Sequence, residues 1–356
     1  MRIGGSGPAL EAGGGPMHLS VLIPTCGRPE KLDACLRALS RQTLDDDLFE
    51  VIVGVDGPGS GEVEVASAAM PSARVFEFAK GGPAATRNRL IEHASGRWLL
   101  WLNDDVAPGP DCVRQHLEAQ ISMDALGRPA MVLGAAPWKI HEPDRLFDRL
   151  VREASMVFFY DQMTPKRNPI ACADPLHDWG FRHAWTLNLS VPGAPVREIG
   201  GFDESLPEAC FEDLEWAWRL RERFSMPVLF RPGAVVVHDH RYEPEGYLAR
   251  ERKLGEQAWQ LAGAAPLCAR AIFGRDLRDA GEIGYARAFV ERERPAAERL
   301  EKTFRGLAEI PATAIEGPHA DALIETIYQQ HLLLKRWCWR RGLVEAAERA
   351  GVQAAA

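Results

Sequence analysis

Residues 98–102 are five consecutive apolar residues, and they lead directly into Asn103, Asp104 and Asp105. A short apolar run of this kind predicts a buried strand whose C-terminal end opens into a polar site. Adjacent carboxylates at such a strand end repel each other unless a cation or several hydrogen-bond donors lie between them. Hard divalent ions such as Mg²⁺ and Mn²⁺ prefer oxygen ligands, and phosphates often complete their coordination. On its own, the stretch fits a metal site and an Asn-Asp-Asp turn equally well.

Strand and helix signals alternate over the first hundred residues. Apolar runs predict strands over residues 18–24, 50–55, 74–78 and 98–102, and the spacing of apolar residues predicts helices over 29–42 and 83–94. Strand–helix units of this length imply parallel strands with right-handed crossovers, and ligands bind such sheets beyond the carboxyl ends of the strands. Because Thr25, Asp56 and residues 103–105 all follow predicted strands, we expect them to meet at one site.

The remainder of the chain changes character twice. Residues 130–210 are rich in proline and aromatic residues, which suits a binding surface, although core aromatics would give a similar composition. A helix is predicted over 211–224, followed by two short strands at 228–230 and 234–237. Beyond about residue 245 only helical patterns remain. We therefore expect a disordered leader (1–17), a domain (18–244) with a nucleotide-binding half (18–125) and an acceptor-binding half (126–244), and a helical extension (245–356).

Composition excludes several classes of protein. The 356-residue chain has a net charge of -8 without blocks of like charge, so a nucleic-acid partner is not expected. The seven cysteines form no C-x-x-C pair and read as reduced thiols of a cytoplasmic protein. Residues 1–17 lack the apolar core of a signal peptide, and no apolar stretch is long enough to span a bilayer. Residues 332–341 mix aliphatic, aromatic and cationic side chains, which fits helix packing, peripheral contact with the inner face of a membrane, or a homodimer.

Several residues have both a chemical and a purely structural interpretation. Asp56 suits a hydrogen bond to a nucleoside, or an Asx-turn before glycine. Arg87 follows Gly81-Gly82 at a helix start, where phosphate binds readily, but an exposed helix face explains it too. Glu212 and Asp213 fit a general base or simple stabilisation of a helix N-terminus. His238 ends a run of three valines and is either a metal ligand or an ordinary polar residue.

Taken together, these residues resemble the inverting family 2 glycosyltransferases of the GT-A fold. The resemblance covers about residues 18–242 and rests on segments whose order and spacing are specific: Ser20–Thr25, Val53–Gly57, Ala84–Asn88, Leu102–Asp105, Asn188–Ser190, Ile199–Glu204, Glu212–Leu220 and the strand ending in His238. It implies an α/β fold with a Rossmann-like, mixed and mostly parallel sheet flanked by helices. The C-terminal helical extension lies outside it.

The resemblance also implies roles for individual residues. Asp105 and His238 would bind Mn²⁺ or Mg²⁺, and Asp213, with Glu212 as the alternate, would deprotonate the acceptor hydroxyl. Trp185 and Asn188 would contact the acceptor. The resemblance gives only the class of acceptor: a saccharide, a lipid-linked molecule or another compound with a hydroxyl group. A UDP-, dTDP- or GDP-sugar donor would contact a larger set of residues, namely Pro24, Thr25, Arg28, Asp56, Arg87, Asn103 and Asp104.

One departure from the family pattern concerns the acidic element. Its first position is Asn103, where many relatives carry Asp, and an uncharged amide contributes less to cation binding. We expect the metal to depend mainly on Asp105. Two other functions fit the same residues: a sugar-nucleotide nucleotidyltransferase, although the chain lacks a lysine-bearing Gly-rich signature early on, and a non-catalytic nucleotide-sugar-binding protein. The expected biological setting is polysaccharide biosynthesis.

Overall fold

The predicted strand–helix alternation forms the first part of the fold. The structure is a computed structural model that describes residues 18–57, 59, 61–206 and 208–351, so the predicted leader lies outside the described residues. The first elements are β1 (Leu19–Thr25), α1 (Pro29–Leu39), β2 (Phe49–Asp56), α2 (Glu62–Ala69), β3 (Arg74–Phe78), α3 (Gly82–His93) and β4 (Trp98–Leu102). These strands pair in parallel, in the order β3-β2-β1-β4.

The second part of the chain completes the sheet and makes it mixed. Its elements are β5 (Val106–Pro108), α4 (Cys112–Ala125), β6 (Met131–Ala135), α5 (Leu146–Glu153), α6 (Pro169–Ala173), β7 (Asn188–Pro192), α7 (Gly193–Glu198), α8 (Glu212–Phe224) and β8 (Val228–His238). Across the described residues the strands follow the order β3-β2-β1-β4-β7-β6-β8-β5. β7 runs antiparallel to both β4 and β6, whereas β6 and β8 are parallel.

The strand β8 differs from the sequence-based prediction of two short strands. It is a single element, and its register with β6 shifts between Gly134 and Ala135. Gly134 lies opposite Arg231, but Ala135 lies opposite Val235. The extra residues, which include Pro232, therefore form a bulge, where a proline interrupts no ladder hydrogen bond.

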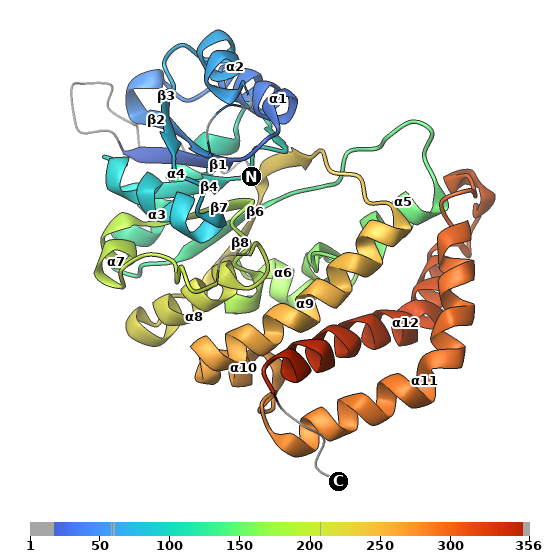
Figure 1. Cartoon of the computed structure of the whole chain (residues 1–356). Coiled ribbons are helices and arrows are strands. Elements are labelled where there is room, and N and C mark those ends of the chain that lie inside the picture. Colours follow the sequence, from blue (N-terminus) through green and yellow to red (C-terminus); the bar gives the residue numbers. More distant parts are fainter. Residues whose placement is uncertain (1–17, 58, 60, 207, 352–356) are drawn as a thin grey trace.

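Within the described residues, the predicted C-terminal extension contains four α-helices, namely α9 (Pro244–Ala264), α10 (Pro266–Phe273), α11 (Ala280–Gly306) and α12 (Ala320–Arg349), and a 3-10 turn at Ala312–Ala314. Figure 1 shows α12 (red) lying between α9 and α11 (both orange), and α12 packs against both. Leu334, Trp337 and Cys338 of α12 are buried, so packing within the chain accounts for the amphipathic segment 332–341. None of the helices in the described part of the chain combines the length and hydropathy that a bilayer-spanning segment requires.

The contact between α9 and α12 is unusually close because glycines lie at the crossing. A Cβ atom placed on Gly255 would lie 1.8 Å from the carbonyl oxygen of Trp339, and one on Gly342 would lie 1.9 Å from that of Arg252. Only glycine lets the two helix backbones approach to this distance. The relative position of α9 and α12 is therefore fixed by backbone contact rather than by adjustable side chains.

The extension shares its hydrophobic cores with the domain that carries the sheet. One core joins Phe147 of α5 to Tyr247 of α9 and Trp337 of α12. A second joins Phe211, next to α8, to Trp259 of α9. The C-terminal helices are thus packed firmly against the part of the chain that contains α5 and α8.

The seven cysteines, all within the described residues, are free thiols, as predicted.

Candidate active site

The carboxyl ends of β1 and β4 bring Thr25 and Asp104 into contact, as the strand pattern predicts. Because β1 and β4 are parallel neighbours, their ends lie at the same edge of the sheet. The Thr25 hydroxyl donates a 2.7 Å hydrogen bond to Oδ2 of Asp104, and both side chains are buried. This contact joins the first and fourth strands at the point where the sheet opens into the site.

Arg28, in the loop after β1, spans the two carboxylates of the Asn-Asp-Asp element. Its Nε atom lies 3.1 Å from Oδ2 of Asp104, and its Nη1 atom lies 2.9 Å from Oδ2 of Asp105. Burial raises the pKa of Asp104 to about 6, although the Arg28 charge opposes this rise. Burial also acts on Asp105, but the imidazoles of His238 and His240 and the charge of Arg28 outweigh it and hold the pKa of Asp105 well below its usual range. Arg28 is thus the cation that the adjacent carboxylates require.

Asp105 and His238 face each other across the edge of the sheet, where β5 pairs with the end of β8. Nε2 of His238 lies 3.6 Å from Oδ1 of Asp105, and Nδ1 of His240 lies 3.7 Å from Oδ2. Within the described residues no group of three or more His, Cys, Asp or Glu side chains forms a complete metal site. Oδ1 of Asp105 is buried and accepts no hydrogen bond from the described residues. One free carboxylate oxygen opposite one imidazole nitrogen is a donor pair that fits Mn²⁺.

Asp56, at the end of β2, is held by the start of α3. Its carboxylate accepts hydrogen bonds from the backbone N–H groups of Gly81 (2.7 Å) and Gly82 (3.1 Å), and Nζ of Lys80 lies 3.2 Å away. Burial raises the pKa of Asp56, but these donors and the lysine charge outweigh burial, so the net pKa is lowered. Asp56 is therefore an ionised carboxylate whose oxygens already have partners.

Arg87 and Glu212 form a buried ion pair between α3 and α8. The distance from Nη1 of Arg87 to Oε1 of Glu212 is 2.7 Å, and the second oxygen of Glu212 accepts a hydrogen bond from the N–H of Cys210. Arg87 also lies over the Phe202 ring. Both Glu212 oxygens are thereby occupied, and Arg87 is not at an exposed helix face.

Asp213 differs from its neighbour Glu212 because no Lys, Arg or His side chain of the described residues forms an ion pair with it. Oδ1 accepts a hydrogen bond from the N–H of Leu214. Burial, followed by the negative charge of Glu212, raises the pKa of Asp213 well above its usual range, with Arg87 opposing the rise. A carboxylate with a raised pKa is suited to accept a proton near neutral pH. Of the two adjacent carboxylates, Asp213 is therefore the one without an ion pair among the described residues.

A cavity of about 450 Å³ lies at the centre of several of these groups. Its lining includes Asn103, Asp105, His238, Asp213 and Trp185. Of the other predicted site residues, Arg28, Arg87 and Glu212 also line it, whereas Pro24, Thr25, Asp56 and Asp104 lie outside its lining.

Asn188 does not reach this cavity. It is fully buried on β7, its amide nitrogen donates to the carbonyl oxygens of Ala135 and Ala234, and its Oδ1 atom lies 2.9 Å from Nε2 of His116. The acceptor role expected for Asn188 therefore has no support in the geometry, and the residue instead joins neighbouring strands and α4.

The C-terminal helices contribute residues that sequence reasoning missed. Arg250 and Glu251 of α9 and Lys335 and Trp339 of α12 line the cavity. Nζ of Lys335 donates a 2.9 Å hydrogen bond to the carbonyl oxygen of Met156, and it lies 3.6 Å from Glu251. These residues belong to segments outside the family pattern, so no motif marked them. The extension therefore forms one wall of the candidate active site.

Comparison with known proteins gives the family. Residues 20–170 match Glycosyl transferase family 2. Glycosyltransferase AglE of Haloferax volcanii is 34% identical over 251 residues, which cover 68% of this chain and 74% of that protein. The chain belongs to glycosyltransferase family 2. The Validoxylamine A glucosyltransferase of Streptomyces hygroscopicus subsp. limoneus is 30% identical over 218 residues, covering 57% of this chain and 47% of that enzyme. The chain thus spans about half the length of this relative.

A solved structure confirms the fold. The mannosyltransferase PcManGT of Pyrobaculum calidifontis, in complex with GDP-Man and Mn²⁺, aligns with a TM-score of 0.52 and 16% sequence identity, covering 94% of this chain and 86% of that one. The predicted GT-A fold, a mixed sheet flanked by helices with a C-terminal helical extension, is confirmed.

Proposed function

We propose that this chain is an inverting glycosyltransferase that moves a sugar from a nucleotide-diphospho-sugar to an acceptor hydroxyl, with a divalent cation and with Asp213 as the general base. The observation that carries the proposal is the placement of Asp213 in the same cavity as Asp105 and His238. Membership of the family and the names of relatives as glycosyltransferases support it.

Asp213 is the proposed base because of its surroundings. Glu212 is neutralised by Arg87, whereas the raised pKa of Asp213 makes it a stronger proton acceptor than an ordinary carboxylate. In the proposed reaction Asp213 accepts the proton of the acceptor hydroxyl while the hydroxyl oxygen forms a bond to the anomeric carbon. The bond from that carbon to the diphosphate oxygen breaks, and the diphosphate leaves with the bonding electrons. One displacement of this kind inverts the anomeric centre.

Asp105 and His238 would hold the cation through Oδ1 and Nε2, the two atoms that face each other 3.6 Å apart. A bound Mn²⁺ or Mg²⁺ would neutralise the negative charge that develops on the leaving diphosphate. Asn103, which also lines the cavity, offers an uncharged oxygen beside Asp105. PcManGT, the structural neighbour, holds GDP-Man and Mn²⁺, which supports this choice of donor class and metal.

The nucleoside would lie toward the ends of β1 and β2, near Thr25 and Asp56, with Asp104 toward the ribose or diphosphate. Asp56 is ionised and fixed by Gly81, Gly82 and Lys80, so it would meet a base N–H without rearrangement. The cationic side chains of Arg28 and Lys80 flank this region and would attract phosphate oxygens. A UDP-, dTDP- or GDP-sugar fits this description equally.

A two-stage experiment tests the proposed function. First, thermal unfolding of the full chain is followed with UDP, dTDP and GDP, each with and without Mn²⁺, because a ligand of the native state raises Tm. Second, sugar donors of the stabilising nucleotide are tested for Mn²⁺-dependent hydrolysis or transfer. Activity that is lost in Asp105→Ala supports the proposal. Nucleotide binding without turnover would indicate a non-catalytic binding protein, and pyrophosphate release from a nucleoside triphosphate and a sugar phosphate would indicate a nucleotidyltransferase.

A further inference from the structure

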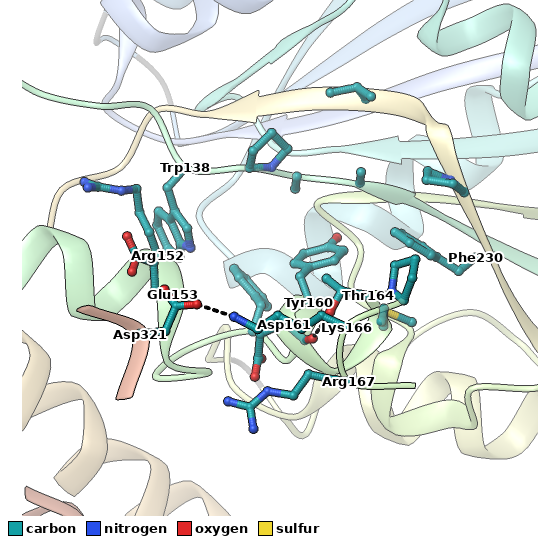
Figure 2. Close-up of a pocket in the computed structure, with 18 of the residues that line it drawn as sticks. Trp138, Arg152, Glu153, Tyr160, Asp161, Thr164, Lys166, Arg167, Phe230 and Asp321 are labelled. Carbon is teal, nitrogen blue, oxygen red and sulfur yellow. Dashed lines mark hydrogen bonds and ion pairs between the residues drawn. The ribbon is translucent and has the colours of Figure 1, made fainter. Parts of the chain in front are cut away.

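A second cavity lies beside the candidate active site and is larger. Figure 2 shows this apolar cavity, which has a volume of about 760 Å³. It lies between the end of β6, the part of β8 from Phe230 to Val235, the segment from Phe158 to Arg167, and the first turns of α12. Its volume falls in the range typical of pockets for small molecules.

Four aromatic rings form a continuous row along this cavity. The ring centroids of Trp138 and Phe158 are 6.0 Å apart, those of Phe158 and Tyr160 are 6.2 Å apart, and those of Tyr160 and Phe230 are 6.1 Å apart. In Figure 2, Tyr160 lies between Trp138 and Phe230. The Tyr160 hydroxyl donates to the carbonyl oxygen of Gly134, so its polar atom is already satisfied. The row therefore offers an elongated apolar surface.

Most of the charged side chains that line the cavity form ion pairs. At the rim, Lys166 pairs with Asp321 of α12, and Nη2 of Arg167 lies 2.9 Å from Oε2 of Glu325. Arg152 pairs with Asp144 and Glu153 with Arg149, whereas Asp161 accepts a hydrogen bond from the Ser155 hydroxyl and has no ion pair among the described residues. Because most of the charges are already paired, a ligand of this cavity gains more from apolar contact than from charge.

The aromatic row begins at the candidate active site. Trp138 stacks on His238, the candidate metal ligand, with the ring centroids 4.3 Å apart. Phe158 lines both cavities, and it contacts Trp185 of the catalytic cavity at a centroid distance of 5.1 Å. Phe158 is half-buried and lies in an irregular segment between α5 and the turn Tyr160–Met163. Phe158 therefore belongs to the walls of both cavities, the one at the candidate active site and the apolar one.

We propose that the apolar cavity binds the hydrocarbon part of the glycosyl acceptor, an alkyl or isoprenoid chain, while the acceptor hydroxyl lies at Asp213. The inference rests on the proposed function, because it assigns the acceptor's two ends to the two adjoining cavities. It explains why the larger cavity is apolar although sugars and nucleotides are polar. It also makes Phe158, Tyr160 and Phe230 residues that determine acceptor specificity.

The test measures binding of hexyl, heptyl and octyl β-glucosides, below their micelle concentrations, by isothermal titration calorimetry with the full chain. Each added methylene should tighten binding about fourfold, the equivalent of its transfer from water. Val235→Trp and Thr164→Trp place a large side chain in the cavity from two different elements. Both should abolish the dependence on chain length. Val237→Trp, on the same strand but outside the cavity lining, should leave it unchanged.

Two further measurements separate the outcomes. Octanol, which has a chain but no sugar, should bind more weakly than octyl glucoside, and Asp213→Asn should weaken only the glucoside. Equal binding of octanol and octyl glucoside would overturn the assignment in favour of a separate lipid site. The assignment also fails if wild-type binding is independent of chain length, or if both tryptophan variants, shown to be folded by circular dichroism, keep the dependence. A nucleotide-induced rise in Tm in the wild type shows that such a failure concerns this cavity alone; no nucleotide binding would instead contradict the proposed function.

Discussion

The Nη1 atom of Arg87 lies 2.7 Å from Oε1 of Glu212, and both side chains are buried. This ion pair distinguishes two adjacent carboxylates that look equivalent in the sequence. Glu212 and Asp213 both line the cavity at the candidate active site, but Arg87 pairs with Glu212 alone. The proposed role of Asp213 as the general base rests on that difference.

Replacing the proposed base should reduce turnover without preventing binding. A positioned base typically contributes about 10²- to 10⁴-fold, so Asp213→Asn should lower kcat by that order while the nucleotide-induced rise in Tm persists. Glu222→Gln, an exposed position on the same helix, is the matched control and should retain wild-type kcat. Wild-type turnover in Asp213→Asn would remove this residue from the mechanism.

The reaction should show an acid limb set by Asp213. Burial and the charge of Glu212 raise the pKa of Asp213 to about 7, and the base must be deprotonated to accept a proton. The rate should therefore fall about tenfold per pH unit below neutrality and level off above it. Arg87→Met removes the charge that opposes the rise, so it should move the limb to higher pH. A pH–rate profile without an acid limb, or one that Arg87→Met leaves in place, would contradict this assignment.

Breaking the Arg87–Glu212 pair should cost more than breaking an exposed one. Arg87→Met leaves a buried, uncompensated carboxylate, which typically lowers the free energy of unfolding by about 3–5 kcal/mol. The double variant Arg87→Met/Glu212→Leu should recover much of that loss, because it also removes the orphaned charge. Arg223→Met breaks an exposed pair with Glu198 and should cost less than about 1 kcal/mol. Urea unfolding of these three variants and wild type measures the losses; equal losses in Arg87→Met and the double variant would argue against a buried charge as the cause.

Arg28 and a divalent cation should compete for the same carboxylates. Arg28 contacts Asp104 and Asp105, so Arg28→Gln leaves negative charge that a cation can neutralise. We expect the variant to be less stable without metal and to bind Mn²⁺ roughly tenfold more tightly, given the size of charge–charge interactions at a partly buried site. Arg37→Gln, which loses an exposed pair with Asp33, is the control. Titration of Tm with Mn²⁺ gives both quantities, and weaker Mn²⁺ binding in Arg28→Gln would mean that Arg28 assists the cation.

The glycine contact between α9 and α12 should tolerate no methyl group. Gly342→Ala places Cβ 1.9 Å from the carbonyl oxygen of Arg252, and neither backbone can yield without moving the helices apart. We expect a loss of at least about 1–3 kcal/mol of unfolding free energy, the usual cost of overpacking. Gly284→Ala, on α11 with no atom within 4 Å of the added Cβ, should instead stabilise by about 0.5–1 kcal/mol. Denaturant unfolding of both variants checks the sign as well as the size.

The ends of β1 and β4 were predictable from sequence because each is marked by a change from apolar to polar residues within a few positions. Residues 98–102 are apolar and become β4, and the polar residues that follow β1 and β4 meet as the parallel pairing requires. The continuity of β8 was not predictable, since Pro232 and Gly233 usually end a strand and are tolerated here only through a bulge against β6. The mixed direction of the sheet also could not be read from the individual strands, because an apolar run does not reveal whether a strand is parallel or antiparallel to its neighbour. It was expected only from the family resemblance.

The site was predictable where strand ends carry it and not where distant segments meet. Asp105 and His238 face each other as expected, but the choice between Glu212 and Asp213 depends on Arg87, which lies 125 positions away. Lys335 is a further example: its contact with the Met156 carbonyl spans 179 positions and involves no motif. For Asn188 the family resemblance implied contact with the acceptor. Its amide instead donates a hydrogen bond to the carbonyl oxygen of Ala234 inside the sheet.

Because α12 supplies one wall of the cavity at the candidate active site, the cavity is complete only after α12 has been synthesised. Translation proceeds from the N-terminal to the C-terminal side of a chain, at about 5–20 residues per second. Thr25, Asp56 and Asp105 are therefore synthesised well before Lys335 and Trp339, the residues of α12 that line the cavity. Until α12 has been made and has packed in place, the strand-end residues lack one wall of the cavity. The complete cavity is thus a late product of folding, although the strand ends that it joins are synthesised early.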